Sequence, residues 1–227
     1  THFEIEFKDV TFGYNRTDSI LKDVSFTAKQ GEVTALVGPS GSGKSTVAKL
    51  AARFWDANSG TVTIGGIRVE DFDSEELLKY YSIVFQDVVL FNDKVYNNIL
   101  IGNRNATREQ GLAAAKAAQC ESFIEKLPQG YDTEIGEKGY TLSGGERQRV
   151  SIVRALAVSP LYLIADEITS SLDIKRSHQV YQYLRAYIKK KQGIGIFVSH
   201  DPIIGSYADK VYKMEEGFLT EGVYKGE

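Results

Sequence analysis

The chain has 227 residues, which is enough for one large domain or two small ones with a sizeable buried core. Its formal charge of −3 gives no basic footprint for nucleic acid, and its single cysteine, Cys120, excludes an intramolecular disulfide and fits a reducing compartment. No apolar run approaches the roughly 20 residues of a membrane span, and no signal peptide opens the chain. The first residue is Thr1, which is compatible with a piece of a longer polypeptide.

The first part of the chain predicts a β-rich start followed by one helix. Alternating apolar and polar residues, or short apolar runs, predict strands at residues 3–12, 20–28, 32–38, 61–64, 67–69 and 82–85. Gly65 and Gly66 separate two of these strands and predict a hairpin. Apolar residues at helical spacing predict a helix over 44–54, directly after a glycine-rich stretch.

The pattern changes to helices between about residues 88 and 159. Helices are expected at residues 95–101, 107–119, 121–127 and 144–158. Strand signals return at 161–166 and 194–199, with a polar-faced helix over 175–191 between them. Because no internal repeat or Pro-rich linker divides the chain, we expect one domain, 1–227, in which the helical segment 88–159 is inserted between segments 1–87 and 160–227.

The glycine-rich stretch at residues 38–45 (GPSGSGKS) predicts a phosphate-binding loop. Its glycines let backbone N–H groups curl around phosphate oxygens, and the following helix offers its N-terminus to the anion. Lys44 is a point charge for β- and γ-phosphates, and Ser45 supplies a hydroxyl for Mg²⁺. A chance Gly/Ser loop is the plainer alternative. The candidate nucleotide-binding residues are Gly38, Pro39, Ser40, Gly41, Ser42, Gly43, Lys44, Ser45 and Thr46.

An apolar strand that ends in two carboxylates is the next signal for chemistry. Asp166 and Glu167 close the run LYLIADE, and buried charges are costly unless they are paired or bound to metal. We expect Asp166 to hold Mg²⁺, directly or through water, and Glu167 to polarise an attacking water as general base. Two solvated acids at a strand end are the alternative, which the upstream Lys44 disfavours.

The segment 142–146 (LSGGE), about a hundred residues after the phosphate-binding loop, indicates the family. Together with ERQR at 146–149, IADE at 164–167, SSLD at 170–173 and His200, it forms an ordered set. This set resembles the ATP-binding cassette (ABC) ATPases from about Phe3 to Gly222. The resemblance implies an α/β fold: a P-loop NTPase (RecA-like) core, an N-terminal antiparallel β subdomain and an inserted α-helical subdomain.

The resemblance also implies roles for three single residues. Tyr14 would stack on adenine, Gln86 would contact Mg²⁺ and the attacking water, and His200 would contact the γ-phosphate and position the water. Each has a plainer alternative, which is a core or edge aromatic for Tyr14, a surface side chain for Gln86 and a structural histidine for His200.

Two further motifs would act between protomers. The resemblance implies that Ser143, Gly144, Gly145 and Glu146 bind the γ-phosphate of the nucleotide held by the other protomer. Ser143 is also a natural N-cap, so an ordinary capped helix start is the alternative. Glu146 stands where the family usually has Gln, and its effect on affinity stays open. The segment 170–173 resembles the family's D-loop at the interface, and Asp173 can also cap the helix over 175–191.

The run 127–139 (LPQGYDTEIGEKG) resembles the stretch of ABC exporters just before their signature segment, which corresponds here to residues 142–146. This resemblance narrows the subclass of ABC ATPase to exporters. The resemblance implies that the loop from Thr133 to Gly139, and the loop of Gln86, touch the transmembrane domains. An acidic surface loop is the alternative.

We therefore expect a Mg²⁺-dependent ATPase domain of an ABC exporter, on the cytoplasmic face of a membrane. It would pair head to tail with a second ABC ATPase domain, identical or different, with two ATPs between them. A soluble ABC ATPase acting on nucleic acid or the ribosome is disfavoured, because no coiled-coil insertion or second cassette is present and the charge is negative. A weak regulatory cassette is disfavoured by the intact Glu167 and His200. No role is assigned to Cys120, His2, His178 or Trp55.

Overall fold

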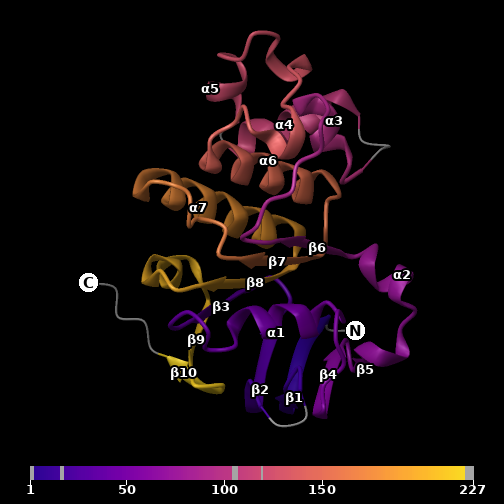
Figure 1. Cartoon of the computed structure of the whole chain (residues 1–227). Helices are drawn as coiled ribbons and strands as arrows, with labels where there is room; N and C mark the ends of the chain where they lie inside the picture. The colour runs from indigo at the N-terminus through magenta and orange to yellow at the C-terminus, as the bar shows by residue number, and fades with distance from the viewer. Residues whose placement is uncertain (1–2, 16–17, 104–106, 119, 223–227) are drawn as a thin grey trace. The chain divides into compact units, whose positions relative to one another are not determined.

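The computed structural model divides into two compact units (Figure 1). The described residues are 3–15, 18–103, 107–118 and 120–222. The first unit comprises residues 1–81, 161–167 and 185–227, and the second comprises residues 82–160 and 168–184. The helical segment expected at 88–159 falls within the second unit, and the assignment of the whole chain to one domain stays a prediction.

An antiparallel sheet forms one part of the first unit, as the resemblance implied. Its strand order is β2-β1-β4-β5, with β1 (Glu4–Phe12), β2 (Leu21–Lys29), β4 (Ser59–Ile64) and β5 (Ile67–Arg68). The alternating apolar residues of β1, among them Ile5 and Phe7, are buried, and the Phe7 ring stacks on Phe26 with 4.7 Å between centroids. The period-2 pattern therefore identified the buried face correctly.

A largely parallel sheet forms the other part of the first unit (Figure 1). Its order within this unit is β10-β9-β3-β8-β7, with β3 (Val33–Val37), β7 (Tyr162–Asp166), β8 (Ile194–Ser199), β9 (Lys210–Glu215) and β10 (Phe218–Gly222). Strand β3 runs parallel to β8 and β9, and β8 runs parallel to β7, whereas β10 is antiparallel to β9. Strands β7 and β8 are buried along their whole length, which explains their continuous apolar runs.

The register of this sheet brings three strand ends to one edge. Val37 pairs with Ser199, and Asp166 pairs with Val198. The residues that follow β3, β7 and β8 therefore emerge together at the carboxyl edge, where ligands of α/β sheets bind. Helix α1 (Lys44–Ala51) also begins here, and it ends three residues earlier than expected because Arg53 adopts a positive φ of 55°.

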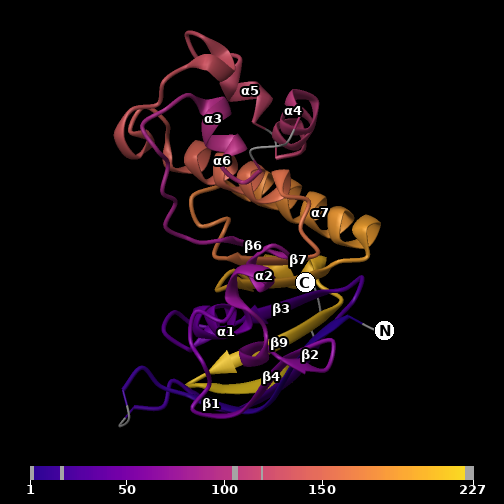
Figure 2. The same cartoon turned by 90° about the vertical axis from the view of Figure 1, so that its right-hand side faces the viewer.

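In the second unit, two helices pack on a third, longer helix (Figure 2). Its helices are α3 (Val95–Leu100), α4 (Arg108–Ala117), α5 (Glu121–Ile124) and α6 (Gly144–Ala157), and both α3 and α4 pack against α6. Arg154 of α6 donates from Nε to the Asn98 carbonyl oxygen at 3.0 Å and from Nη2 to Asn98 Oδ1 at 3.1 Å. Asn98 is fully buried, so these bonds satisfy polar groups that would otherwise be costly.

Cys120 lies directly before α5 and has no exposed surface. Its backbone N–H donates to the Ala115 carbonyl oxygen at 2.8 Å. Burial raises the pKa of the Cys120 thiol to about 12, so the side chain behaves as a small apolar group within the second unit.

Several elements were not expected from the sequence or lie at the borders of the units. Strand β6 (Tyr81–Val84) and helix α7 (Ile174–Lys191) each have residues in both units. The short helix α2 (Ser74–Leu78) was not predicted, and Asp73 caps it by accepting from the N–H groups of Glu75 and Glu76. The short 3₁₀ helices are η1 (Val69–Asp71), η2 (Gly130–Asp132), η3 (Glu137–Gly139) and η4 (Pro202–Tyr207). Within the described ranges, every helix is too short or too polar to cross a membrane.

Candidate active site

The glycine-rich loop between β3 and α1 requires glycine at two positions. A Cβ on Gly38 would lie 2.1 Å from the Met214 carbonyl oxygen, and one on Gly43 would lie 2.7 Å from Leu21 Cδ2. Gly43 also has a φ of 107° directly before the first turn of α1. Larger residues at either position would therefore displace the loop from the strand and helix that shape it.

Lys44 is buried inside this loop, with 4% of its surface exposed. Its Nζ donates to the carbonyl oxygens of Gly38 and Pro39 at 2.9 and 2.8 Å, and it lies 4.0 Å from Glu167 Oε1. Burial lowers the pKa of Lys44, against the opposing charges of Glu167 and Asp166. An anion that enters the loop would meet a cation held by two neutral carbonyls and one carboxylate, with little water to screen it.

Ser45 and Asp166 form a hydroxyl–carboxylate pair at the start of α1 and the end of β7. Ser45 Oγ donates to Asp166 Oδ1 at 2.9 Å. Burial raises the pKa of Asp166, although the Ser45 hydrogen bond and the charge of Lys44 act against it. A cation would relieve this cost, and a hydroxyl with a carboxylate suits Mg²⁺. Among the described residues there is no group of three or more His, Cys, Asp or Glu that could hold a metal.

Glu167 sits in a strained backbone conformation, with a φ of 53°, directly after β7. A left-handed conformation costs a non-glycine residue on the order of 1 kcal/mol or more, and such strain concentrates at functional sites. Its N–H donates to the Val198 carbonyl oxygen at 2.9 Å. Its Oε2 lies 2.8 Å from His200 Nδ1 and accepts from Ser199 Oγ at 3.4 Å. The ends of β7 and β8 thus place the Glu167 carboxylate between Lys44 and His200.

Tyr14 follows β1 and leaves 42% of its surface exposed. Its ring contacts Phe12 at 5.1 Å between centroids and Trp55 at 5.4 Å, with interplanar angles of 85° and 80°. Lys49 Nζ lies 5.9 Å from the Tyr14 centroid. The ring is therefore held by neighbours and still partly open to solvent, which a stacking platform requires.

In the second unit, Ser143 caps α6 in a reciprocal arrangement with Glu146. Ser143 Oγ accepts from the Glu146 N–H at 3.3 Å, and the Ser143 N–H donates to Glu146 Oε2 at 2.8 Å. The expected N-cap is confirmed, and it is a full capping box, which accepts Glu or Gln at this position equally. Glu146 therefore has a structural task that the usual Gln can also perform.

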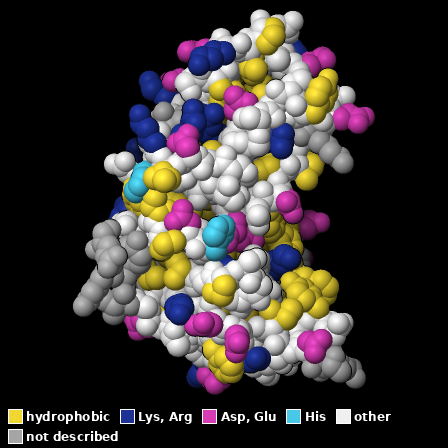
Figure 3. Space-filling model, turned by 60° about the vertical axis from the view of Figure 1, so that its left-hand side comes forward, with side chains coloured by type: hydrophobic (Ala, Val, Ile, Leu, Met, Phe, Trp, Pro, Cys, Tyr) yellow, Lys and Arg dark blue, Asp and Glu magenta, His cyan; other side chains and the backbone are white. Residues whose placement is uncertain are grey.

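A pocket of about 320 Å³ opens beside this helix start. It is lined by Ser143, Gly144, Gly145, Glu146, Arg149, Ser171, Leu172, Asp173 and Arg176. Figure 3 shows Lys and Arg side chains gathered on one face of the helical unit, in the upper part of the view. Asp173 Oδ1 accepts from the Arg176 N–H at 2.8 Å, which confirms Asp173 as a cap of α7. The pocket therefore offers an N-terminal helix turn and the Arg149 guanidinium to an anion, whereas Arg176 is paired with the Asp173 carboxylate.

The arginines of this pocket were not given roles by the sequence. Arg149 lies within the ERQR run, and its guanidinium carbon is 4.6 Å from the Phe123 ring centroid. Burial lowers the pKa of Arg149, so its charge is poorly solvated. One turn of α6 separates Arg149 from Gly145, and this helical spacing was the signal that could have identified it.

Gln86 and the loop from Thr133 to Gly139 also belong to the second unit. A pocket of about 290 Å³ is lined by Gln86, Asp87, Val88, Gly144, Arg147, Gln148, Ser170 and Ser171. The loop pairs with the chain before α3, because the Val95 N–H donates to the Thr133 carbonyl oxygen at 3.0 Å. Gln86 thus shares one pocket with the signature and with the segment 170–173.

The structure collects the candidate residues in two groups. Those of the first unit are Tyr14, the loop residues 38–46, Asp166, Glu167 and His200. Those of the second unit are Gln86, the loop from Thr133 to Gly139, residues 143–146 and residues 170–173.

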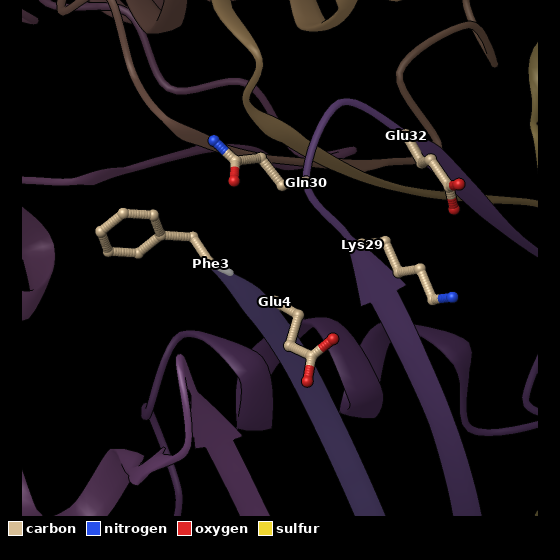
Figure 4. Close-up of a pocket in the computed structure, with 5 residues that line it drawn as sticks. All are labelled: Phe3, Glu4, Lys29, Gln30 and Glu32. Atoms are coloured by element: carbon tan, nitrogen blue, oxygen red, sulfur yellow. The ribbon is translucent and has the colours of Figure 1, made fainter. Parts of the chain in front are cut away.

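A further pocket of the first unit, of about 330 Å³, lies at the opposite end of β1 from Tyr14 (Figure 4). Phe3 and Gln30 lie on one side of it, and Lys29 and Glu32 lie on the other. None of the residues that the sequence singled out lines this pocket.

The comparisons with known proteins agree with the motifs. The family model described as ABC transporter matches residues 21–170. The chain is 41% identical over 218 residues to an ATP-dependent lipid A-core flippase of Legionella pneumophila (strain Paris), covering 96% of this chain and 37% of that protein. It is 40% identical over 219 residues to the mitochondrial iron-sulfur clusters transporter ATM1 of Candida glabrata, covering 96% of this chain and 30% of that protein.

A solved structure gives the same result for the fold. The structure of a bacterial Atm1-family ABC exporter with ATP bound is similar to this chain with a TM-score of 0.92 and 40% sequence identity. The match covers 97% of this chain and 39% of that chain, so this sequence spans well under half the length of the relatives it matches. From its motifs, its P-loop fold and these similarities, the chain belongs to the ABC transporter family and corresponds to the ATPase domain of its exporters.

Proposed function

We propose that this chain binds ATP with Mg²⁺ at the carboxyl edge of its parallel sheet and hydrolyses it to power export across a membrane. One observation carries the proposal. Lys44, Asp166, Glu167 and His200 come from segments up to about 150 residues apart, and the register of β3, β7 and β8 delivers them to one edge. Lys44, which would bind phosphate, thus lies beside the Glu167 carboxylate, and Ser45, which would bind the metal, lies beside the Asp166 carboxylate.

Each side chain has a part in positioning or charge stabilisation. Lys44 would leave its carbonyl partners to meet the β- and γ-phosphates, and Tyr14 would stack on adenine. Ser45, Asp166 and Gln86 would hold Mg²⁺, which supplies charge neutralisation to the phosphates when bound.

The chemical step is an in-line attack of water on the γ-phosphorus. Glu167 would accept the water proton as the new P–O bond forms and the bond to the β,γ-bridging oxygen breaks, releasing ADP and phosphate. His200, joined to Glu167 at 2.8 Å, would orient the water and the γ-phosphate. Because contacts to Lys44, Ser199 and His200 already hold the Glu167 carboxylate in place, it needs little reorganisation during the reaction.

The signature segment would complete the site of a second protomer. Ser143, Gly144, Gly145 and Glu146 would bind the γ-phosphate of ATP held by the partner, in a head-to-tail dimer. The capped start of α6 and the cation of Arg149 support an anion site there.

Transmembrane domains would be driven by this cycle from the cytoplasmic face of the membrane. The loops of Gln86 and of residues 133–139 would contact them, and ATP-driven closure and reopening of the dimer would change their conformation. The similar solved structure, which is named as an Atm1-family ABC exporter, supports export as the direction, and the transmembrane domains would choose the cargo.

Phosphate release from ATP tests the ATPase and the dimer together. The rate should vanish in EDTA, return with Mg²⁺, and rise more steeply than linearly with protein concentration as dimers form. A rate that is strictly proportional to concentration, from a protein shown to be monomeric, would contradict the shared site. Hydrolysis that persists in EDTA would contradict the metal site.

A further inference from the structure

Trp55, the only tryptophan of the chain, is half exposed and yet packed on two aromatic rings. Its centroid lies 5.4 Å from that of Tyr14, with an interplanar angle of 80°, and 6.3 Å from that of Phe12. Because 51% of Trp55 remains exposed, core burial alone does not explain its position. Its neighbour Tyr14 is the ring proposed to hold adenine.

The segment around Trp55 is anchored on both sides. Toward its end, Asn58 Oδ1 accepts from the Gly13 N–H at 2.7 Å, and the Asn58 N–H donates to the Thr11 carbonyl oxygen at 3.0 Å. Toward its start, Arg53 pairs with Asp56 at 3.6 Å between Nε and Oδ1 and donates from Nη1 to the Phe72 carbonyl oxygen. Trp55 is thus presented by a segment that is tied to the residue directly before Tyr14.

The two rings that contact Tyr14 stand nearly perpendicular to it. Phe12 lies at 85° and Trp55 at 80°, the edge-to-face geometry that the aromatic quadrupoles favour. With Trp55 removed, Phe12 would be the one aromatic ring left against Tyr14 among the described residues, and the half-exposed ring could turn about its side-chain torsions.

We propose that Trp55 is a positioning residue for the nucleotide base, which holds the partly exposed Tyr14 ring in the orientation that stacks on a purine. The inference rests on the proposed stacking of adenine on Tyr14. It adds a role for the segment that follows α1. Helix α1 begins with Lys44, which is proposed to bind the phosphates, and the segment after the helix places Trp55 against the Tyr14 ring. One helix and its following segment would then position both ends of the nucleotide.

The role predicts an effect that depends on the base and not on the phosphates. Lys44 and Ser45 make their contacts with residues other than Trp55, so phosphate binding should not need it. An edge-to-face pair contributes enough to change binding by about 2- to 10-fold. Inorganic triphosphate, which has no base, therefore separates the positioning role from general loss of structure.

The test is calorimetry of MgATP and of inorganic triphosphate with this chain and five variants. Trp55→Ala should weaken ATP binding by about 2- to 10-fold and leave triphosphate binding unchanged. In a Tyr14→Ala background, Trp55→Ala should have no further effect, because it acts through Tyr14. Trp55→Phe, which keeps a ring, should bind ATP within about 2-fold of the parent. Phe3→Ala, an exposed aromatic at the far end of β1, is the matched control and should change neither affinity.

The outcomes distinguish this inference from the proposed function. If Tyr14→Ala weakens ATP binding but Trp55→Ala does not, the positioning role is wrong and stacking stands. A Trp55→Ala effect that persists without Tyr14, or that extends to triphosphate, also overturns the role, because Trp55 then contacts the ligand itself or supports the fold. If Tyr14→Ala leaves ATP binding unchanged, stacking on Tyr14 fails, and the positioning role with it.

Discussion

Glu167 and His200 are joined by a 2.8 Å contact between Oε2 and Nδ1, although 33 residues separate them in the chain. The contact uses one carboxylate oxygen, while the other, Oε1, faces Lys44 at 4.0 Å. A single side chain thus bridges the residue proposed to bind phosphate and the residue proposed to orient water. This geometry allows the two roles to be tested separately.

Glu167→Gln should nearly abolish turnover while ATP affinity stays within about 3-fold, because an amide preserves shape and hydrogen bonding but accepts no proton. Loss of a general base costs about 10²- to 10⁴-fold. An ATP-trapped dimer should then elute on size-exclusion chromatography. Unchanged turnover would dismiss Glu167 as the base.

Lys44→Ala should weaken ATP binding by about 2–3 kcal/mol, as expected for a buried charge-assisted contact. Tyr14→Ala should weaken it less, by about 1 kcal/mol, because only stacking is lost. Calorimetry on the two variants and the parent checks the order. Equal affinities in all three proteins would contradict both roles.

Ser143→Arg tests the site shared between protomers. It should leave ATP binding by the monomer almost intact and block ATP-driven dimerisation and hydrolysis, because a bulky cation would occupy the space of the γ-phosphate. Mixing it with Lys44→Ala gives dimers in which one composite site carries both lesions and the other carries none. Activity should partly return in the mixture, provided that one intact site turns over. Full activity of Ser143→Arg as a demonstrated monomer would overturn the shared site.

Glu146→Gln should leave the free energy of unfolding within about 0.5 kcal/mol of the parent, because both residues complete the capping box with Ser143. Glu146→Ala should cost on the order of 1 kcal/mol by urea titration, since the Ser143 N–H loses its partner. If the glutamine variant is as unstable as the alanine variant, the carboxylate charge stabilises the helix, and not the cap hydrogen bond.

Asp166→Asn should stabilise the nucleotide-free chain, more so at pH 7 than at pH 4. Burial raises the pKa of Asp166 in the folded state, so the folded chain holds a proton that the unfolded chain releases near the ordinary value of 3.8. Stability is therefore lost as pH rises from 3.8 through the folded-state pKa, and asparagine removes this loss. Urea titrations at both pH values measure the difference.

Asp209→Asn is the matched control of opposite sign. Burial acts to raise the pKa of Asp209, but the Val33 N–H and the cations of Lys189 and Arg185 outweigh it and lower the pKa. The ionised form is thus favoured in the folded state, and asparagine should destabilise the chain at pH 7, with less effect as the pH falls toward the folded-state pKa. If both variants shift stability in the same direction, burial is not what controls Asp166.

The sequence predicted the strands and helices in which the buried residues form a continuous run or recur at a regular spacing. Strands β7 and β8 were readable because both of their faces are buried, and α6 because Ser143 caps it before a regular apolar stripe. Helix α2 has five residues, too few to show a period, and only the cap by Asp73 marks it. Strand β9 has two adjacent buried residues, Val211 and Tyr212, and strand β10 begins with an exposed Phe218, so neither strand shows a regular alternation.

For the site, the sequence indicated residue types and order but not their mutual contacts. The hydrogen bond from Ser45 to Asp166 spans 121 residues and depends on strand order, which no local pattern contains. Trp55 was passed over for the same reason, because it follows α1 whereas its partner Tyr14 follows β1. The positive φ of Glu167 likewise has no local signal, because it occurs at a glutamate and not at a glycine.

The buried Cys120 makes this chain a convenient background for labelling. Since the thiol is fully covered and its pKa is about 12, maleimide reagents at neutral pH should leave the native chain unmodified. A cysteine introduced at an exposed position would then be the one reactive thiol, so spin or fluorescence labels could follow protomer separation without removing a native residue. Slow labelling of Cys120 itself would report how often the second unit opens.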